Sequence, residues 1–285
     1  MTRRRGLRWR PCTRCSALRV VVKIGGSLMK KEPPAGLIQD FARLAPEHQL
    51  ILVHGGGDVV TDYATRLGKE QRFVVSPEGV RSRYTDKDTA EIYQMVMSGL
   101  LAKRLVQALR REGLRGVSIS GSDGGLLQGK RKSKLVVVDE RGRKVAIEGG
   151  YTGKVQEVDP TLLNVFLEKG YVPVISPVAR GEAGEPLNID GDRAASSVAA
   201  GTGADAVIFA TNVDGLMLDG RLAERVSAAE ASSRLSAVGY GMQKKVMAAV
   251  EAVEGGVDEA IICSGVRESP LSRALAHEGC TVITP

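Results

Sequence analysis

The sequence predicts an α/β fold around a mainly parallel sheet, and two stretches carry this prediction. In the first, residues 19–27, apolar residues around Lys23 lead into two glycines and a serine. In the second, residues 50–57, an apolar run ends in His54 and three glycines. Each stretch reads as a buried strand, a glycine turn and the start of a helix. Because parallel strands end at the same edge of a sheet, both turns should face one crevice, which is where open α/β sheets bind ligands.

Helical spacing and turn residues predict the other elements of the first half. Residues 87–112 read as one long helix, whose apolar stripe suits either the core or a dimer contact. Two β-prone runs flank Asp139 to Arg143 in the way that is typical of a hairpin. The remaining predictions are helices at 36–44 and 59–67, a loop or short hairpin at 71–80, a strand at 117–120 before a glycine turn, and hairpin strands at 135–138 and 144–147.

The second half continues the alternation of helices and strands. Residues 178–187, rich in Gly, Glu and Pro, look like a joint between two lobes. Asn188, Asp190 and Asp192 then stand at the start of a helix of small residues, where such side chains ordinarily act as caps. The other predicted elements are helices at 161–169, 194–201 and 246–254, and strands at 172–177, 206–210, 259–263 and 281–283.

Composition places the chain among globular proteins. It has 285 residues, 43% of them hydrophobic, and no apolar run approaches the length of a membrane span, so we expect no membrane partner. Because the N-terminus lacks the apolar core of a signal peptide, we expect a cytoplasmic protein. The four cysteines, Cys12, Cys15, Cys263 and Cys280, do not make a disulfide framework in a chain of this length, so we expect reduced thiols.

The positive net charge of the chain belongs to a tail. The formal net charge is +7, but residues 1–17 hold six of the arginines and no acid, which leaves 34 of the 40 basic residues against 33 acidic ones. The tail lacks helical or strand periodicity, so we expect it to be disordered. A nucleic-acid-binding function would have to rest on this tail, and a single Cys12-x-x-Cys15 is a weak zinc signal. We therefore expect no nucleic-acid partner and no metal site.

The first glycine turn has the chemistry of a phosphate site. Glycines leave backbone N–H groups unobstructed, a helix N-terminus adds partial positive charge, and the Lys23 ammonium stands just before the turn. The alternative is a core strand whose lysine reaches out to solvent. A glycine-rich approach, a helix start and a lysine occur together again at Lys245, although the chain has neither a Walker-type motif nor a dinucleotide fingerprint after the first strand.

Three further features bear on binding. Arg83 could fork onto a carboxylate, which suits its planar donors, or it could form a surface ion pair with Asp86 or Asp88. His54 is more easily explained as a satisfied turn histidine than as a catalytic base. The predicted hairpin carries seven basic residues and two acidic ones between positions 130 and 144, which fits either a solvated surface or an acidic macromolecular partner.

Six motifs, taken in this order, closely resemble the amino acid kinase family. They are Lys23-Ile24-Gly25-Gly26-Ser27, His54-Gly55-Gly56-Gly57, Arg83-x-Thr85, Asn188-x-x-x-Asp192, Thr211-x-Val213-x-Gly215-Leu216 and Gly241-Met242-x-x-Lys245. The resemblance runs from about Leu18 to the C-terminus and is strongest to the N-acetylglutamate kinase branch. Segments 82–86 and 150–154 look more like the subgroup that phosphorylates aminoadipate or glutamate carried on a small acidic amino-group carrier protein.

This resemblance implies a three-layer αβα sandwich with a central mainly parallel sheet. It implies an N-terminal lobe at 18–178, which binds the amino acid and forms a homodimer, and a C-terminal lobe at 179–285, which binds ATP. Residues 1–17 are unlike the long amphipathic helix that builds hexamers in the arginine-sensitive branch, so we expect no arginine feedback.

The resemblance also implies transfer of the γ-phosphoryl group of ATP to a side-chain carboxylate. Lys23 and Lys245 would neutralise the moving phosphoryl group, and Asp192 would hold both ammonium groups in place. A carboxylate is already an anion at pH 7, so the reaction requires no general base. Magnesium would be carried on the ATP phosphates. The other implied site residues are Gly56 and Gly57 as N–H donors, Arg83 on the substrate α-carboxylate, Asn188 on its amide end, and Gly25, Gly26, Thr211, Asn212, Asp214, Gly215 and Leu216 on the nucleotide side.

Two substrate hypotheses follow. The leading one is a kinase for carrier-bound aminoadipate or glutamate in lysine or arginine biosynthesis, with the basic hairpin available to dock an acidic carrier. The alternative is a kinase for free N-acetylglutamate. Aminoadipate and glutamate differ by one methylene, which is worth only about 1 to 3 kcal/mol in a pocket, so both stay open.

Overall fold

The structure is a computed structural model that describes residues 17–77, 79, 81–235 and 238–285. The predictions of a disordered tail and of a weak Cys12–Cys15 zinc signal concern residues outside this range. Among the described residues, no helix is both long and apolar enough to cross a membrane.

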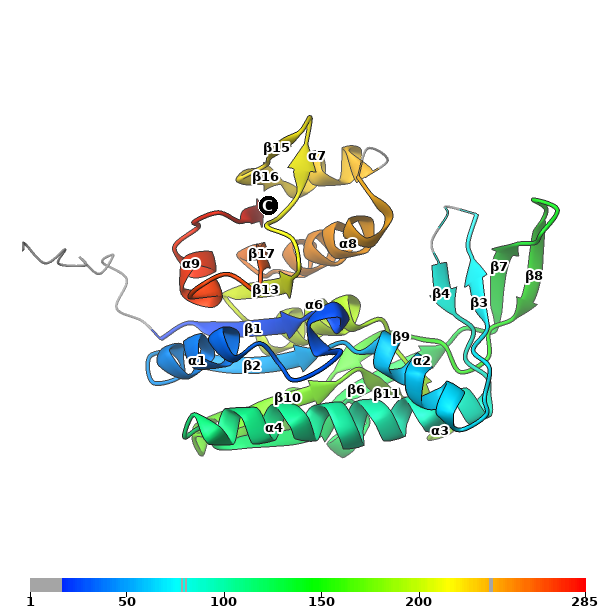
Figure 1. Ribbon diagram of the computed structural model, residues 1–285, viewed down its shortest axis with the longest axis horizontal. Coiled ribbons are helices and arrows are strands. Elements are labelled where there is room, and N and C mark those ends of the chain that lie inside the picture. Colours follow the sequence, from blue (N-terminus) through cyan, green and yellow to red (C-terminus); the bar gives the residue numbers. More distant parts are fainter. Residues whose placement is uncertain (1–16, 78, 80, 236–237) are drawn as a thin grey trace, which may run out of the picture.

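One eight-stranded sheet organises the molecule, as the sequence predicts (Figure 1). Strand β1 (Arg19–Ile24) lies at its centre and pairs in parallel with β2 (Gln49–His54) and with β13 (Ala206–Thr211). Every pairing in this sheet is parallel except that of β17 with β18. The strand order is β16 (Arg225–Ser227), β18 (Thr281–Thr284), β17 (Glu259–Ser264), β13, β1, β2, β10 (Val172–Ser176) and β5 (Gly116–Ser120).

Alternating residues of the central strands build two separate cores, one on each face of the sheet. Val20 and Val22 belong to the first core and Val21 to the second, because successive side chains of a strand point to opposite faces. The first core contains residues of α1 (Ala35–Leu44), α2 (Gly57–Arg66), α3 (Lys87–Gln94), α4 (Ala102–Arg111) and α9 (Pro270–Leu275). The second contains residues of α5 (Thr161–Glu168), α6 (Gly191–Thr202), α7 (Ala228–Ser233) and α8 (Tyr240–Glu254). Helices therefore cover both faces, which makes the three-layer αβα arrangement.

The helix predicted at 87–112 is continuous but not uniform. Its middle turn, Met95–Leu101, is a π-helix between α3 and α4. The Asp86 side chain caps the beginning of α3 by accepting a hydrogen bond from the Thr89 N–H at 2.9 Å. Such π-helical turns are rare and often lie next to functional sites.

A second, four-stranded sheet lies beside the main one, in the order β12 (Pro186–Asn188), β11 (Val178–Arg180), β6 (Leu127–Arg131) and β9 (Gly153–Val158). The segment 178–187, predicted to be a joint, thus contains β11 and most of β12. The division of the chain into lobes at 18–178 and 179–285 stays a prediction.

Two hairpins project from the same end of the molecule (Figure 1). Strands β3 (Phe73–Val75) and β4 (Arg81–Arg83) form the first, and β7 (Lys134–Val138) and β8 (Lys144–Glu148) form the second, which confirms the predicted hairpin. The two hairpins contact each other through β3 and β7. The smaller remaining elements are the 3₁₀ turns Gly26–Met29 and Asp123–Gly125 and the strands β14 (Met217–Leu218) and β15 (Arg221–Leu222).

Candidate active site

The two predicted glycine turns meet at the carboxyl edge of the main sheet. The Gly25 N–H donates to the Ala210 carbonyl and the Gly55 N–H to the Ile24 carbonyl, both at 2.9 Å, so each turn is tied to the neighbouring strand. A Cβ atom added to Gly55 would lie 2.8 Å from the Gly26 nitrogen. Backbone therefore packs directly against backbone here, and only glycine allows this approach.

Lys23 and Asp192 form a buried ion pair beside these turns. Lys23 falls on the same face of β1 as Val21, which is the face that α6 covers. Its Nζ lies 2.5 Å from Oδ1 of Asp192, and both side chains are at most 7% exposed. Asp192 is held at the start of α6, where the Asp190 side chain accepts hydrogen bonds from the N–H groups of Asp192 and Arg193 at 3.0 and 3.2 Å. The alternative that Lys23 reaches out to solvent is wrong.

Lys245 reaches the same carboxylate from the other side. It lies in α8, which packs against α6, and its Nζ is 3.1 Å from Oδ2 of Asp192. The helix begins at Tyr240, several residues earlier than predicted, so Lys245 stands in its second turn and not at its start. Two ammonium groups from distant parts of the chain thus share one carboxylate.

The electrostatics of this cluster favour an anionic ligand. Burial alone would raise the pKa of Asp192, but attraction by Lys23 and Lys245 outweighs burial and lowers the pKa to about 2. Burial, and then repulsion by Lys23, lower the pKa of Lys245, while Asp192 opposes this shift. The cluster of Lys23, Asp192 and Lys245 carries one more positive than negative charge in a buried place, where an incoming anion would compensate it.

Arg83 holds the second glycine turn. Its Nη2 donates to the Gly57 carbonyl at 2.7 Å and to the Thr61 hydroxyl at 2.8 Å, while Nη1 donates to Gln71. The side chain is buried, and the alternative of a surface ion pair is wrong because Asp86 and Asp88 pair with Lys69 instead. Arg83 therefore lies at the beginning of α2, next to two of the predicted substrate-binding glycines.

Asn188 is joined to the segment that follows Arg83. Its Nδ2 donates to the Thr85 hydroxyl at 2.9 Å, and its backbone N–H donates to the Tyr151 carbonyl. Tyr151 in turn donates its N–H to the Thr85 carbonyl at 2.6 Å. These bonds connect the motifs that contain Thr85 and Asn188 with the segment 150–154.

The predicted nucleotide loop follows β13 at the same edge of the sheet. Thr211 ends this strand, and the Leu216 N–H donates to the Thr281 hydroxyl at 2.8 Å. Leu216 is fully buried, so its side chain supports the loop from inside. Asp214 pairs with Arg267 at 2.5 Å, which joins the loop to the turn after β17.

Two apolar side chains on these joined loops are exposed. Val213, which belongs to one of the six motifs, is 42% exposed, and Val266 is 62% exposed. Sequence reasoning missed Val266, because in the sequence it looks like an ordinary loop residue.

His54 is neutral, and only one of its two ring nitrogens has a hydrogen-bond partner in the described part of the chain. It is fully buried at the end of β2, and its Nδ1 lies 3.1 Å from the Gly55 carbonyl oxygen. Its Nε2 is buried and has no hydrogen-bond partner among the described residues. Burial is the main cause that lowers the pKa of His54 to about 4, with a smaller contribution from Lys23. The prediction of a fully satisfied turn histidine is therefore wrong for one of the two nitrogens.

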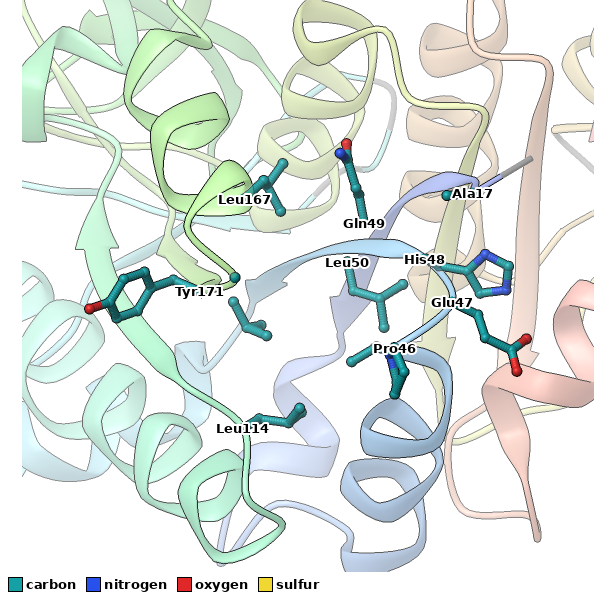
Figure 2. A pocket seen from close by; sticks show the side chains of 12 residues that line it. Ala17, Pro46, Glu47, His48, Gln49, Leu50, Leu114, Leu167 and Tyr171 are labelled. Atoms are coloured by element: carbon teal, nitrogen blue, oxygen red, sulfur yellow. The ribbon is translucent and has the colours of Figure 1, made fainter. Parts of the chain in front are cut away.

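Two cavities have linings that do not include Lys23, Asp192 or Lys245. One, of about 380 Å³, is lined by residues such as Leu50, Leu114 and Tyr171 and opens at the amino-terminal ends of β2 and β10 (Figure 2). The other, of about 530 Å³, is lined by Lys130, Arg131, Lys132, Ser133, Lys134, Lys154, Val155 and Gln156. In the described part of the chain, no group of three or more His, Cys, Asp or Glu residues could hold a metal ion.

Comparisons with known proteins agree on one family. A family model described as "Amino acid kinase family" matches residues 18–264. A Cenarchaeum symbiosum protein named "Putative LysW-aminoadipate/LysW-glutamate kinase" is 53% identical over 264 residues, which cover 93% of this chain and 98% of that protein. The "LysW-aminoadipate/LysW-glutamate kinase" of Saccharolobus islandicus (strain Y.N.15.51 / Yellowstone #2) is 43% identical over 265 residues, covering 93% and 99% of the two chains.

A solved structure has the same fold over most of the chain. It is an N-acetylglutamate synthase from Neisseria gonorrhoeae complexed with coenzyme A and N-acetyl-glutamate, with a TM-score of 0.76 and 25% sequence identity. The similarity covers 94% of this chain but only 59% of the longer synthase chain.

Proposed function

The chain belongs to the amino acid kinase family, and from this premise we propose that it is an ATP-dependent kinase for carrier-bound aminoadipate or glutamate. The amino acid is attached to a LysW-type amino-group carrier protein, and the product is an acyl phosphate on the side chain. Relatives 43 to 53% identical over nearly their full length carry this activity in their names. The observation that carries the proposal is the cluster of Lys23, Asp192 and Lys245 beside the two glycine turns.

The chemistry follows from the charges. The acceptor carboxylate attacks as an anion, so no side chain has to remove a proton, and the protein's work is alignment and charge neutralisation. Lys23 and Lys245 face the transferred phosphoryl group from opposite sides, while Asp192 keeps their Nζ atoms in place. Backbone N–H groups of the glycine turns supply donors that need no reorganisation.

ATP and magnesium fit this donor set in different ways. ATP phosphates are anions that suit the Lys23 and Lys245 ammonium groups and the amides of Gly25 and Gly26. Both carboxylate oxygens of Asp192 already face a lysine at 3.1 Å or less, so they are poor ligands for a cation. Magnesium would therefore be carried on the ATP phosphates, where it would supply additional charge neutralisation.

The carrier protein docks on a basic wall, which is formed by the side chains that line the larger of the two cavities. Lys130, Lys132, Lys134 and Lys154 line the cavity of about 530 Å³, and within the described chain none of them forms an ion pair. Burial, followed by repulsion from Arg193, Lys154 and Lys244, lowers the pKa of Lys132. Because these lysines repel one another and have no ion-pair partners among the described residues, binding of an acidic protein would stabilise them.

Homodimer formation and a cytoplasmic location stay predictions. The long helix offers a surface for the dimer contact, since Met95 in its π-helical turn is 62% exposed.

An ATP-consumption assay tests the proposed function. The substrates compared are carrier-linked aminoadipate, carrier-linked glutamate and free N-acetylglutamate. We expect turnover of a carrier-linked substrate, with kcat lowered at least about 100-fold in Lys23→Ala and in Lys245→Ala, because each lysine acts on charge that develops during transfer. Lys169→Ala is the matched control, since Lys169 is exposed at the end of α5.

Two results would contradict the proposal. Efficient turnover of free N-acetylglutamate, with none of a carrier-linked substrate, would select the alternative function. Unchanged kcat in both lysine variants would remove the assigned catalytic centre.

A further inference from the structure

The phosphoryl-transfer proposal gives His54 no part, yet His54 has the most unusual environment of the three histidines in the chain. It ends β2 immediately before the second glycine turn and is fully buried. Because it alternates with Leu50 and Leu52, it lies on the face of the sheet opposite to Lys23. It thus supports the glycine turn from behind, away from the lysines.

The hydrogen bond of His54 determines its tautomer. Nδ1 lies 3.1 Å from the Gly55 carbonyl oxygen, and a carbonyl can only accept, so Nδ1 carries the proton. Nε2 is then an acceptor, and it is buried with no partner among the described residues. A buried acceptor without a hydrogen-bond partner destabilises the fold, so we expect His54 to offset this cost through another role in the protein.

Fixing the Gly55 carbonyl also fixes the next amide. The Gly55 C=O and the Gly56 N–H belong to one peptide plane and point in opposite directions, because the peptide is trans. The Gly56 N–H donates to no group among the described residues. A peptide between two glycines rotates more freely than any other, so its direction has to be imposed from outside.

We propose that His54 is a positioning residue for phosphoryl transfer, which holds the Gly55 carbonyl through Nδ1–H so that the Gly56 N–H stays free to donate to the transferred group. This inference rests on the proposed kinase function. Leu101 and Met97 complete the support, since a Cβ atom on Gly56 would overlap Leu101 and come within 3.3 Å of the Met97 sulfur. The π-helical turn that carries both residues therefore packs beside the Cα atom of Gly56, next to the amide that His54 orients.

A neutral imidazole suits this role. With a pKa of about 4, His54 keeps its single Nδ1 proton across the neutral range. A permanently charged donor at this place would repel Lys23, whose charge the reaction needs.

Substituting His54 by asparagine or by glutamine tests the contributions of its two ring nitrogens separately. In His54→Asn the amide nitrogen takes roughly the place of Nδ1, in His54→Gln that of Nε2, and His54→Leu has no donor. We expect Asn to keep kcat within about threefold, and Gln and Leu to lower it about tenfold or more with KM little changed, because the lost donor acts in the transition state. His277→Asn, in an exposed turn after α9, is the matched control.

Binding of ADP with aluminium fluoride, which imitates the transferred phosphoryl group, gives a second readout. His54→Leu should weaken this complex about tenfold more than it weakens ADP alone, which a merely structural role would not do. If His54→Leu does not fold, the comparison of Asn with Gln decides alone.

The inference is overturned if His54→Gln or His54→Leu keeps the wild-type kcat, or if Asn is as impaired as Gln. If the wild-type enzyme turns over a carrier-linked substrate, either of these results leaves the proposed function intact. Absence of that wild-type turnover would instead reject the proposed function.

Discussion

Asp192 is the residue on which the charge balance of the site depends. It separates two ammonium groups that would otherwise repel each other in a buried place. Removing one partner of a buried ion network costs far more than removing a surface pair, because the remaining charges lose their compensation.

This balance predicts how Asp192→Asn responds to pH. Without the carboxylate, burial and repulsion by Lys23 act unopposed and lower the pKa of Lys245 further. Lys245 then loses its proton at a lower pH than in the wild type, so kcat of the variant should fall as pH rises, and should do so earlier than wild-type kcat. Profiles of kcat against pH check this. Parallel profiles of the two enzymes would contradict it.

The buried imidazole of His54 predicts a pH-dependent stability. Its pKa falls from 6.5 in the unfolded chain to about 4 in the folded one. Between these values the unfolded chain binds more protons, so stability is fully present above pH 6.5 and is lost as pH falls toward 4. From pH 7 to pH 5.5 the wild type should lose about 1 kcal/mol of unfolding free energy through this residue.

Urea unfolding at the two pH values measures this loss. His54→Asn, which has no titrating group at this position, should lose about 1 kcal/mol less than the wild type over the same interval. An equal loss in both proteins would show that His54 is not the titrating group.

For single residues, the sequence indicates which side chains belong to the site but not which groups they contact. Lys23 and Lys245 could be selected because each follows or precedes a glycine-rich turn at a helix start, whereas Asp192 is selected through the family resemblance. That Arg83 bonds to Gly57 and Thr61, and that one nitrogen of His54 lacks a partner, depends on neighbours far away in the chain. Local sequence patterns do not reveal those contacts.

Among the elements, the paired glycine turns are the most constrained. Gly55 faces backbone, which cannot move aside as a flexible side chain can. Gly36 in α1 offers the opposite case, because no atom lies within 4 Å of an added Cβ.

Alanine substitutions at these two glycines should have opposite effects. Gly55→Ala should destabilise the fold by about 1 to 3 kcal/mol and lower kcat, because the turns must separate. Gly36→Ala should stabilise it by about 0.4 to 1 kcal/mol, because alanine suits a helix and restricts the unfolded chain. Urea unfolding and the kinase assay check both. A stabilised, fully active Gly55→Ala would contradict the close packing.

The β7–β8 hairpin and the adjoining strand carry the prediction for the carrier. Lys132→Glu with Lys134→Glu should raise KM for the carrier-linked substrate about tenfold and leave kcat little changed, because both lysines lie outside the reacting cluster. The wild-type KM should also rise with salt, as expected for screened attraction. Lys169→Glu provides the control. If KM does not respond to either the charge reversal or salt, the carrier docks elsewhere.

Elements with a strong local signal could be predicted, whereas those stabilised by their neighbours could not. The strands at 19–24 and 49–54 and the hairpin at 134–148 follow from apolar runs and turn residues. The π-helical turn at 95–101 has the same apolar stripe as an α-helix, so periodicity does not reveal it. Strands β11 and β12 have only three residues each and exist because they pair with each other and with β6.

Considered as a whole, the molecule is joined through its centre. Strand β1, from the predicted first lobe, pairs along its length with β13, from the second. Each of the two cores contains residues from both sides of this boundary, such as Val22 with Ile208 in one and Val21 with Phe209 in the other. Neither lobe can unfold without exposing the core of the other.

Calorimetry should therefore record one cooperative transition. The calorimetric and van't Hoff enthalpies are expected to agree, because the sheet and both cores are shared. ATP should raise the midpoint temperature without splitting the transition, because it binds the folded state. Two separate transitions would show that the lobes at 18–178 and 179–285 fold independently.

At the scale of the whole molecule, the residues alone predict an α/β fold around a mainly parallel sheet, and the three-layer arrangement is implied by the family resemblance. The order of the strands within the central sheet could not be predicted, since the Gly- and Pro-rich stretch at 178–187 has the composition of a linker. The pairing of β1 with β13 shows that a strand from the second half of the chain lies beside the first strand.

The position of Lys245 has a consequence for synthesis of the chain. Lys23 and Asp192 leave the ribosome well before Lys245. A product of premature termination between Asp192 and Lys245 has both glycine turns and the basic wall but only one of the two ammonium groups. Such a fragment lacks one cation of the reacting cluster, so a working catalyst exists only after translation has passed Lys245.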